Sequence, residues 1–359
     1  MSGTFMAADS PPQPPSRGEG GAPPLLSERL ALAHLPTPLV RPRSLLEALG
    51  LGERGIDLWI KRDDATGGPE AGNKIRKLEF LLAAATREKA TVLVTCGGIQ
   101  SNHARATAIV GAQLGLRAVL LLRTTETGAP LPITGNVLLD RLVGAEIRLI
   151  TPAQYRTRTA LMAEVAAELM KRGERPYVIP EGGSNALGSL GYVEAMAEVR
   201  KQLDAGLGGG KPFDVIIHAC GSGGTAAGVA LGAARSNVAA EVWPMPVRQA
   251  AAYSRGVVAR LVGEARAPGP SLAAPAVVAI DDREKGPGYA VANDEQKRLV
   301  IEVARASGLL LDPVYTGKAF AGLVRAARDG KLDGRRVLFL HTGGLPGLLA
   351  QGEDLSAVL

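Results

Sequence analysis

Lys74 carries the strongest chemical signal in the sequence. A strand pattern over residues 56–60 gives way to a glycine-bearing loop, and a helical pattern starts directly after Asn73. The positive end of the helix dipole and the charges of Arg76 and Lys77 disfavour an ammonium there, so we expect a lowered Lys74 pKa. A lysine of this kind is a candidate Schiff-base nucleophile. The alternative is a solvated surface lysine at a basic helix start, and this segment alone does not exclude it.

Three polar residues follow another predicted strand. The strand pattern covers residues 92–96, two glycines follow it, and Ser101, Asn102 and His103 open the next helix. Backbone N–H groups at a helix start bind anions, so this turn is a candidate site for a carboxylate. The structural alternative is a simple helix cap made by Ser101 or Asn102. Three consecutive polar side chains are more than a cap requires, which favours binding.

A glycine-rich loop follows the strand pattern of residues 215–220. Its members are Gly221, Ser222, Gly223, Gly224 and Thr225. A loop between a strand and a helix suits a phosphate, because the N–H groups at the helix start are free to donate. The spacing of Gly221, Gly223 and Ala226 also fits the dinucleotide fingerprint, with Glu241 roughly twenty residues further on. The loop alone therefore leaves a nicotinamide dinucleotide and a phosphorylated cofactor both open.

Two tyrosines lie in glycine-bearing loops. Tyr289 and Tyr315 are two of the six tyrosines in the chain. A tyrosine in such a loop is a candidate acid or base, and a packed aromatic side chain is the alternative. His34, His218 and His341 show no metal-ligand spacing with the cysteines or with one another, so no metal site is predicted.

Short apolar strands alternate with helices along most of the chain. The strands are expected at residues 92–96, 118–122, 146–150, 177–179, 215–220, 241–244, 276–280 and 337–341. The helices are expected near residues 75–88, 101–115, 133–143, 155–172, 188–205, 225–235, 246–262, 293–306 and 317–328. This order predicts two parallel sheets covered by helices on both faces and divided near residues 182–184. The segment before Lys74 is expected to return to the second sheet.

Composition narrows the class of protein. The chain has 359 residues, enough for two domains, and it has no apolar run long enough to cross a bilayer. Its two cysteines lie in strand patterns, which predicts a reduced, cytoplasmic protein without a disulfide framework. The net charge of +6 is dispersed, so neither nucleic acid nor a membrane is an expected partner. Residues 1–24, rich in proline and glycine, are expected to form a disordered tail.

Seven segments together resemble the pyridoxal-phosphate enzymes of the tryptophan-synthase β superfamily (fold type II). The most similar branch contains D-cysteine desulfhydrase and 1-aminocyclopropane-1-carboxylate (ACC) deaminase. The segments are Pro36–Leu39, Ile60–Asp64, Gly72–Glu79, Gly98–His103, Pro180–Gly188, Gly221–Thr225 and Leu311–Lys318. They follow the family's order between about Leu35 and Ala350. The resemblance favours a bound pyridoxal phosphate over the dinucleotide and the surface lysine.

The resemblance implies a fold as well as a cofactor. That fold is α/β, with two open, twisted, parallel-sheet domains of three layers each. The large domain would comprise residues 25–73 and 188–359 and bind pyridoxal 5′-phosphate, and the small domain would comprise residues 74–187. Relatives are commonly homodimers, so a homodimer is expected.

Individual roles are also implied by the resemblance. The implied catalytic residues are Lys74, Ser101, Tyr289 and Tyr315. The implied cofactor contacts are Lys74, Asn102, Gly221, Ser222, Gly223, Gly224, Thr225, Thr316 and Thr342. The implied substrate contacts are Ser101, Asn102, His103, Tyr289 and Tyr315. Lys74 would hold the cofactor covalently and move the Cα proton, Asn102 would bond to the ring 3′ oxygen, and the glycine loop would grip the phosphate.

Two threonines indicate the branch. In ACC deaminases the residue after the loop tyrosine resembles a glutamate that faces the pyridine nitrogen, and the residue before the final Gly-Gly is typically leucine. This chain has Thr316 and Thr342 at these positions, as D-cysteine desulfhydrases do. A neutral hydroxyl makes the cofactor a weaker electron sink than a carboxylate does, which suffices when a good leaving group departs from Cβ.

The predicted reaction is therefore the α,β-elimination of D-cysteine to pyruvate, hydrogen sulfide and ammonia. The alternatives are an L-cysteate sulfo-lyase and an ACC deaminase. More remote alternatives are a pyridoxal-phosphate-binding protein without activity and a nicotinamide-dependent oxidoreductase. The turn at Trp243–Arg248 departs from the small residues expected in the family, and Arg248 is a cation that a sulfonate substrate would need.

Overall fold

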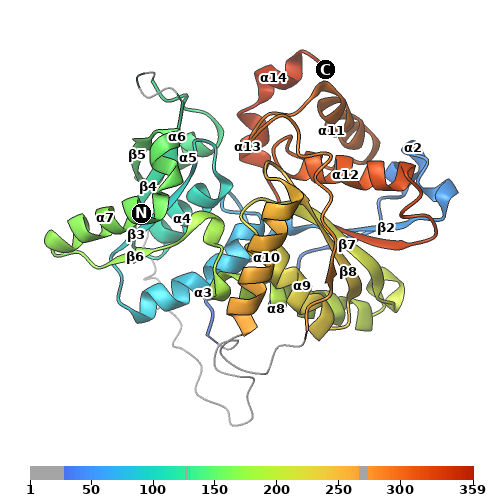
Figure 1. The fold of residues 1–359 in the computed structure, drawn as a ribbon, viewed down its shortest axis with the longest axis horizontal. Helices are drawn as coiled ribbons and strands as arrows, with labels where there is room; N and C mark the ends of the chain where they lie inside the picture. The colour runs from blue at the N-terminus through green and yellow to red at the C-terminus, as the bar shows by residue number, and fades with distance from the viewer. Residues whose placement is uncertain (1–27, 126–127, 129, 267–273) are drawn as a thin grey trace, which may run out of the picture.

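The computed structural model describes residues 28–125, 128, 130–266 and 274–359 (Figure 1). The predicted tail, residues 1–24, lies outside these segments. The described chain is an α/β protein with two separate sheets, one in each lobe of Figure 1. Within the described segments, no helix combines the length and the apolar character that crossing a membrane requires.

The larger sheet has six strands. In sheet order they are β1 (Leu39–Val40), β2 (Asp57–Lys61), β10 (Arg336–Leu340), β7 (Phe213–Cys220), β8 (Ala239–Pro246) and β9 (Val277–Val278). All neighbours are parallel except β1, which runs antiparallel to β2. Strand β2 pairs with β10, so the prediction that the opening segment returns to this sheet is confirmed. The antiparallel β1 is a correction, because only parallel neighbours were predicted for the two sheets.

The smaller sheet has four parallel strands. In sheet order they are β5 (Glu146–Ile150), β4 (Arg117–Arg123), β3 (Val92–Gly98) and β6 (Pro176–Val178). Every residue of the central strand β3 is buried, as expected for a parallel strand with helices on both faces. The two sheets are separate, and we propose that they are the centres of the two predicted domains.

Helices cover both sheets and make three layers in each lobe. Beside the small sheet lie α3 (Asn73–Arg87), α4 (Asn102–Gln113), α5 (Gly135–Leu142), α6 (Pro152–Arg156) and α7 (Arg158–Lys171). Around the large sheet lie α2 (Arg43–Ala48), α8 (Ala186–Asp204), α9 (Gly224–Arg235), α10 (Ala251–Arg266), α11 (Asp294–Ser307) and α12 (Thr316–Arg328). The chain ends in α13 (Leu345–Leu349) and α14 (Gly352–Ser356). Short 3₁₀ turns occur at Gly52–Arg54, Asp63–Ala65, Glu181–Gly183 and Leu207–Gly210.

Two predicted helices differ from the observed ones. The helix predicted at residues 155–172 is divided at Thr157 into α6 and α7. The helix predicted from residue 246 begins only at Ala251, because β8 continues to Pro246 and pairs with β7 to its end. Prolines at 244 and 246 hold the residues before them in extended conformations, which explains the longer strand.

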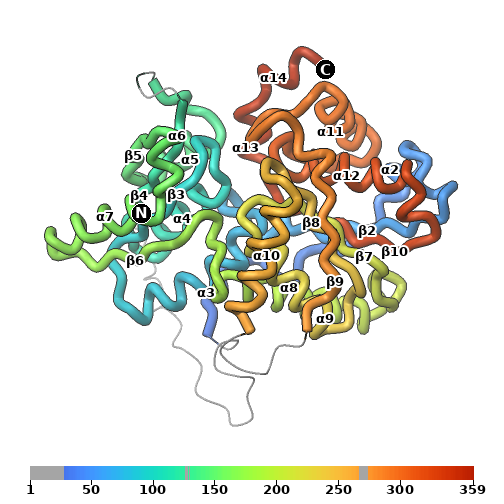
Figure 2. The backbone as a smooth tube through the Cα atoms, in the orientation of Figure 1, coloured from blue at the N-terminus to red at the C-terminus, as the bar shows by residue number. Residues whose placement is uncertain are grey.

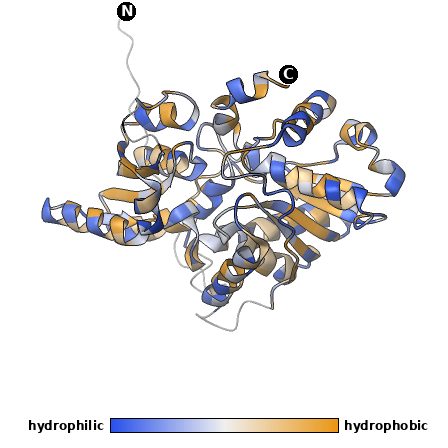
Figure 3. Cartoon of the chain, turned by 45° about the horizontal axis from the view of Figure 1, so that its top comes forward, coloured by the Kyte–Doolittle hydropathy of each residue, from blue (hydrophilic) through white to orange (hydrophobic). Residues whose placement is uncertain are grey.

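Alternating side chains divide the core of the large lobe. Val215 and Ile217 of β7 pack in one cluster with α11 and α12, and Ile216 packs on the opposite face with α8 and α9. The strands therefore carry apolar residues on both faces, and Figure 3 shows them as hydrophobic bands between helices. Placing both faces in a core fixes the strand register, since a slip of one residue would exchange the two clusters.

A buried ion cluster fixes helix α3 from behind. Arg76 donates to both carboxylate oxygens of Asp63, each at 2.8 Å, and to Glu198 of α8 at 3.0 Å. Lys61 of β2 donates to the same glutamate at 2.5 Å. Lys61, Asp63 and Arg76 are each at most 1% exposed. Although burial alone raises it, the Asp63 pKa is held below its usual value by Arg76 and Lys61. The cluster joins α3 to both β2 and α8.

Replacing Asp63 with alanine should lower the free energy of unfolding by about 3–5 kcal/mol, because the buried charges of Arg76 and Lys61 lose a partner. Asp64→Ala is the matched control, since Asp64 pairs with Arg62 in a partly exposed position. Its loss should be about 1 kcal/mol or less. Urea denaturation midpoints measure both effects. Equal losses in the two variants would contradict the anchoring role of the cluster.

Candidate active site

A cavity of about 490 Å³ lies where the carboxyl ends of both sheets face each other. Its wall includes residues at the ends of β3, β4, β7, β8 and β10. Ligands bind at this edge of open parallel sheets, and the volume lies in the range of small-molecule sites. Figure 2 shows the small-sheet lobe and the large-sheet lobe side by side, joined by the chain that crosses between them.

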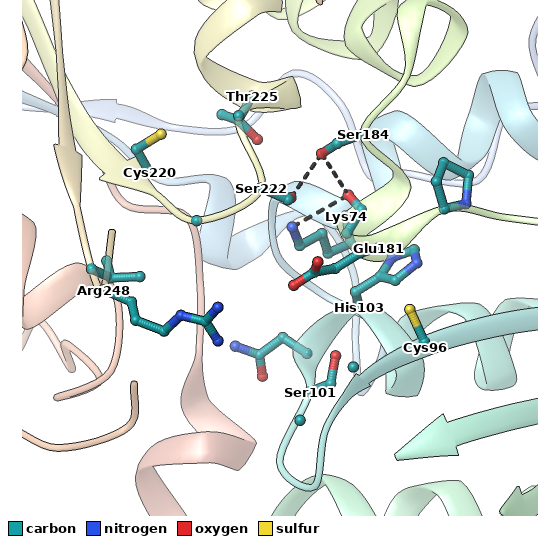
Figure 4. Close-up of a pocket in the computed structure, with 18 of the residues that line it drawn as sticks. Lys74, Cys96, Ser101, His103, Glu181, Ser184, Cys220, Ser222, Thr225 and Arg248 are labelled. Carbon is teal, nitrogen blue, oxygen red and sulfur yellow. Dashed lines mark hydrogen bonds between the residues drawn. The ribbon is translucent and has the colours of Figure 1, made fainter. Parts of the chain in front are cut away.

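Lys74 is the second residue of α3 and enters the cavity (Figure 4). The helix start is fixed by a hydrogen bond that the Asn73 N–H donates to the Thr342 carbonyl at 3.0 Å. The preceding residue, Gly72, has φ +119°, and a Cβ there would lie 3.0 Å from the same carbonyl. Only glycine therefore allows this close approach without strain.

Burial lowers the Lys74 pKa to about 8. Glu181 and Cys220 oppose this shift but do not cancel it. The predicted direction is confirmed, and the predicted cause is corrected. Arg76 points to the other side of α3, where Asp63 and Glu198 compensate its charge. Desolvation of the amine, a property of the folded cavity, lowers the pKa instead.

The glycine loop connects β7 to the start of α9. Gly223 has φ +87°, a left-handed conformation that favours glycine. The Ser222 and Ser184 hydroxyls are hydrogen-bonded at 2.7 Å, and Thr225 Oγ1 accepts a bond from Asn73 Nδ2 at 3.0 Å. All members of the loop except Gly224 line the cavity. The structure therefore brings the predicted phosphate loop against the helix that carries Lys74.

A second lysine supports this loop from behind. Lys77 Nζ donates to the Gly182 carbonyl at 2.7 Å and to Ser184 Oγ at 2.8 Å. A Cβ on Gly224 would lie 2.7 Å from both Lys77 Nζ and Ser184 Oγ, which explains a glycine there. Burial, and then the charge of Lys74, hold the Lys77 pKa well below its usual value. An anion in the loop would therefore lie near a buried amine.

The turn before α4 combines a cap with cavity-lining side chains. Ser101 Oγ accepts from the Ala104 N–H at 3.2 Å, so the simple-cap alternative is present. Ser101, Asn102 and His103 nevertheless all line the cavity. Thr95 Oγ1 donates to the Ile179 carbonyl and therefore accepts from His103 Nε2 at 2.9 Å. Burial, with Lys74 and Lys77 nearby, holds the His103 pKa well below its usual value, so the ring is neutral.

Asn136 orients the amide of Asn102. Asn136 Nδ2 donates to the Gln100 carbonyl at 3.0 Å and to Asn102 Oδ1 at 3.1 Å. The backbone carbonyl can only accept, so the assignment of Nδ2 is fixed. Asn102 thus uses its oxygen toward Asn136, and its own amide N–H groups remain to donate to a cavity ligand.

Tyr289 and Tyr315 meet inside the cavity. Their hydroxyls are 2.7 Å apart, and their rings pack edge to face with centroids 6.0 Å apart. Burial raises the pKa of both hydroxyls, that of Tyr315 strongly. Both hydroxyls are therefore protonated near neutral pH. One of them donates to the other, and the proton of the second is left for a cavity ligand. A Cβ on Gly98 would lie 2.8 Å from the Tyr289 ring, which accounts for the second glycine of that turn.

The two predicted threonine contacts differ. Thr342 lines the cavity, whereas Thr316 does not. Thr316 Oγ1 donates to Asp312 Oδ1 at 2.7 Å and accepts from the Asp312 N–H at 2.8 Å. Asp312 also accepts the N–H groups of Val314 and Tyr315, so its carboxylate caps the start of α12. The predicted cofactor contact of Thr316 stays a prediction that this hydrogen bonding does not support.

Several cavity residues had no predicted role. Glu181 is the single carboxylate in the cavity wall of the described chain, and it forms an ion pair with Arg158, whose Nε lies 2.8 Å from Glu181 Oε2. The Arg123 guanidinium lies 4.8 Å from the ring centroid of Tyr155 and 5.2 Å from that of Tyr289. Glu181 lies in a segment of the family resemblance and was open to prediction. The guanidinium stacking depends on tertiary packing and has no sequence signal.

Arg248 is also placed by the structure. It follows β8, lines the cavity and extends toward it in Figure 4. Its side chain makes no hydrogen bond or ion pair with the described residues. Arg248, the cation that a sulfonate substrate would need, therefore lies at the cavity wall.

Comparisons with known proteins agree on one family. Residues 30–343 match the family model described as "Pyridoxal-phosphate dependent enzyme". The chain is 42% identical over 342 residues to the mitochondrial bifunctional D-cysteine desulfhydrase/1-aminocyclopropane-1-carboxylate deaminase of Arabidopsis thaliana, covering 94% of this chain and 83% of the relative. It is 41% identical over 334 residues to D-cysteine desulfhydrase of Klebsiella pneumoniae, covering 91% and 97%. A crystal structure of an ACC deaminase homologue superposes with a TM-score of 0.81 at 36% identity, covering 93% of this chain and 98% of that one.

Uptake of pyridoxal phosphate by the cofactor-free protein should depend on the Lys74 pKa. The neutral amine is the nucleophile, so with a pKa of about 8 the rate should fall about tenfold per pH unit below pH 7 and level off above pH 9. Growth of the visible absorption band after mixing measures the rate. N-acetyl-lysine methyl amide in the same buffers gives the chemistry without the protein. A rate that still rises tenfold per unit to pH 10 would indicate an ordinary lysine.

Proposed function

The chain belongs to the pyridoxal-phosphate dependent enzyme family, and on that premise we propose that it catalyses α,β-elimination of D-cysteine. The products would be pyruvate, hydrogen sulfide and ammonia, with one water consumed. The names of the Arabidopsis and Klebsiella relatives support this class of reaction. The choice of substrate within the class rests on the cavity.

The cavity suits pyridoxal phosphate. The glycine loop presents backbone N–H groups and two hydroxyls at the start of α9, where a phosphate would be held. Lys74 presents an amine for covalent attachment of the cofactor, and Asn102 presents free amide donors for a ring oxygen. Bulkier side chains at Gly223 or Gly224 would collide with Val257 or Lys77, so the cradle requires its glycines. We propose these residues as the cofactor contacts.

One observation carries the proposal. A lysine with a pKa of about 8 and two protonated tyrosines line the same cavity. Elimination needs a base at Cα and an acid at the leaving group. The lowered Lys74 pKa leaves a larger share of neutral amine near neutral pH than an ordinary lysine has, and both tyrosines keep their protons. The four residues predicted to be catalytic, Lys74, Ser101, Tyr289 and Tyr315, all line this cavity, which supports the proposal. The Ser101 hydroxyl also caps helix α4.

The chain's residues would act in order. When bound, the cofactor withdraws electrons from the substrate Cα and so acidifies its proton. Lys74 then removes that proton, the Cα electron pair forms the new double bond to Cβ, and the Cβ–S bond breaks with its electron pair on sulfur. Tyr289 and Tyr315 place a hydroxyl proton at the departing sulfur. The released enamine takes up water to give pyruvate and ammonia, and the Ser101 turn would hold the substrate carboxylate.

Glu181, the single carboxylate that the described residues place in the cavity wall, bears on the choice between D-cysteine and ACC. A carboxylate beside the pyridine nitrogen keeps the ring protonated and strengthens the electron sink, which opening a cyclopropane requires. Glu181 is paired with Arg158. Thr342 stands where an ACC deaminase typically has leucine. A thiolate leaving group tolerates the weaker sink, so these features favour D-cysteine.

Arg248 favours a second candidate substrate. An exposed guanidinium at the cavity wall, with no carboxylate partner among the described residues, suits an anionic side chain such as the sulfonate of L-cysteate. Elimination would then release sulfite. ACC stays a further candidate through the name of the Arabidopsis relative. The predicted homodimer and cytoplasmic location stay predictions.

A substrate panel tests the proposal. D-cysteine, L-cysteine, L-cysteate and ACC are each added to the holoenzyme, and keto acid, sulfide and sulfite are assayed. D-cysteine should give pyruvate and sulfide in equal amounts. Arg248→Gln should leave this turnover within about twofold, because a neutral β-substituent makes no charged bond there. Turnover of L-cysteate or ACC with D-cysteine unreacted would replace the proposed substrate, and loss of cysteate turnover in Arg248→Gln would confirm the second candidate.

A further inference from the structure

Lys318 is a buried lysine to which the reaction assigns no part. It is the third residue of α12 and is 1% exposed. Its Nζ lies within ion-pair distance of no carboxylate in the described segments. A buried ammonium is costly unless all its N–H groups are bonded, so its partners identify what it does.

The Lys318 ammonium donates to three backbone carbonyls. The acceptors are the oxygens of Val247 at 3.1 Å, Lys285 at 2.8 Å and Gly288 at 2.7 Å. An ammonium has three N–H groups, so its donor capacity is fully used. Bonds to a charged donor are stronger than those between neutral groups. One side chain therefore holds two loops that are far apart in the sequence.

Both loops line the cavity. Val247 begins the segment after β8, and residues 247–249 all contribute to the cavity wall. Gly288 directly precedes Tyr289, the cavity tyrosine. The Lys318 ammonium thus lies outside the cavity wall and is bonded to the backbone from which these side chains extend.

Tyr289 is attached to α12 at two points. Its hydroxyl is hydrogen-bonded to Tyr315, the N-cap residue of α12, and the carbonyl just before it accepts from Lys318. Tyr315 and Lys318 are three residues apart and share one face of the helix. The side chain of Tyr289 and the backbone just before it are therefore both bonded to the same helix, α12.

The backbone beside Tyr289 needs such support. Ala290 has φ +61°, a left-handed conformation that a residue with a Cβ adopts at a cost. Inside the loop, the Val291 N–H donates to the Gly288 carbonyl at 3.4 Å and Gln351 donates to Ala290 O at 3.4 Å. Nearer its start, Gln296 donates to the Glu284 carbonyl at 2.8 Å. Lys318 adds two charge-assisted bonds to this segment, at the carbonyls of Lys285 and Gly288.

We propose that Lys318 is a positioning residue for the reaction, holding Tyr289 and the Val247–Gln249 segment in place at the substrate side of the cavity. It acts through these loops and touches neither substrate nor cofactor. The consequence for turnover rests on the proposed function of Tyr289, whereas the positioning itself does not. Cofactor binding, which depends on the glycine loop and α3, is independent of it.

Lys318→Met keeps the aliphatic stem and removes the three donors. In the holoenzyme, hydrogen exchange of peptides covering residues 246–252 and 281–291 should become at least about tenfold faster, with the rest of the chain unchanged, because three charge-assisted bonds are lost. Lys285→Met is the matched control. It removes a lysine side chain from the same loop, where Lys285 pairs with Asp282 near the surface, but keeps the carbonyl that Lys318 binds.

Kinetics give the second readout. With the best substrate of the panel, kcat/KM of Lys318→Met should fall about 10–100-fold while the visible band of the bound cofactor is retained. In a Tyr289→Phe background the same substitution should cost at most a few fold, because both changes act on one unit. Equal effects in the two backgrounds, unchanged exchange of the two loops, or faster exchange spread over the whole chain would overturn the proposal.

Gly286→Ala decides the matter if Lys318→Met does not fold. A Cβ on Gly286 would lie 2.9 Å from the Val291 carbonyl oxygen and 3.0 Å from Lys318 Nζ, and the glycine has φ +71° in a half-buried loop. The alanine should displace the same contact and speed exchange in the same two peptides. A protein that turns over no substrate of the panel but shows the localised exchange would reject the proposed function and retain Lys318 as the positioning residue.

Discussion

The ion cluster behind α3 is the constraint on which the site depends. Arg76 of α3 is bonded to Asp63 and Glu198, so the helix cannot rotate or slide without separating buried charges. Its start is held by the Thr342 carbonyl, and these two attachments together place the Lys74 side chain in the cavity. The same helix puts basic residues on opposite sides. Arg76 is neutralised within the protein, whereas the Lys74 amine stands in a desolvated cavity with a lowered pKa. Burial in the cavity therefore makes Lys74 a reactive amine, whereas the nearby Arg76 stays a charged, paired guanidinium.

The other cavity residues come from both lobes, and most of them lie in loops that follow the carboxyl ends of strands. The large sheet supplies the glycine loop after β7 and the tyrosine that starts α12, and the small sheet supplies the polar turn after β3. Parallel strands bring these loops to one edge although they are far apart in the sequence. Each group is then held by a second residue that reaches it from outside the cavity. Asn136 orients Asn102, Lys77 supports Ser184, and Lys318 holds the backbone of Tyr289.

The sequence predicted the parts whose chemistry is local. Lys74, the glycine loop and the two tyrosines were found because helix starts and strand ends carry recognisable residue types, and the strands were located by their apolar patterns. The sequence could not show that Asp63 neutralises the charge of Arg76 or that the Thr316 hydroxyl is hydrogen-bonded to Asp312. Nor could it show that the Arg123 guanidinium packs on the rings of Tyr155 and Tyr289. Those facts arise from contacts between distant segments. Lys318 stood in a segment of the resemblance, yet its role appears only when two separate loops meet its ammonium.

The most direct test of the account is to locate the lysine that carries the cofactor. The holoenzyme is reduced with borohydride, digested, and analysed by fragmentation mass spectrometry, which distinguishes Lys74 from Lys77 three residues later. A single pyridoxyl group is expected on Lys74, because its amine lines the cavity while the Lys77 amine is engaged by Gly182 and Ser184. A label on Lys77, or on any other lysine, would contradict the central assignment and the catalytic roles built on it.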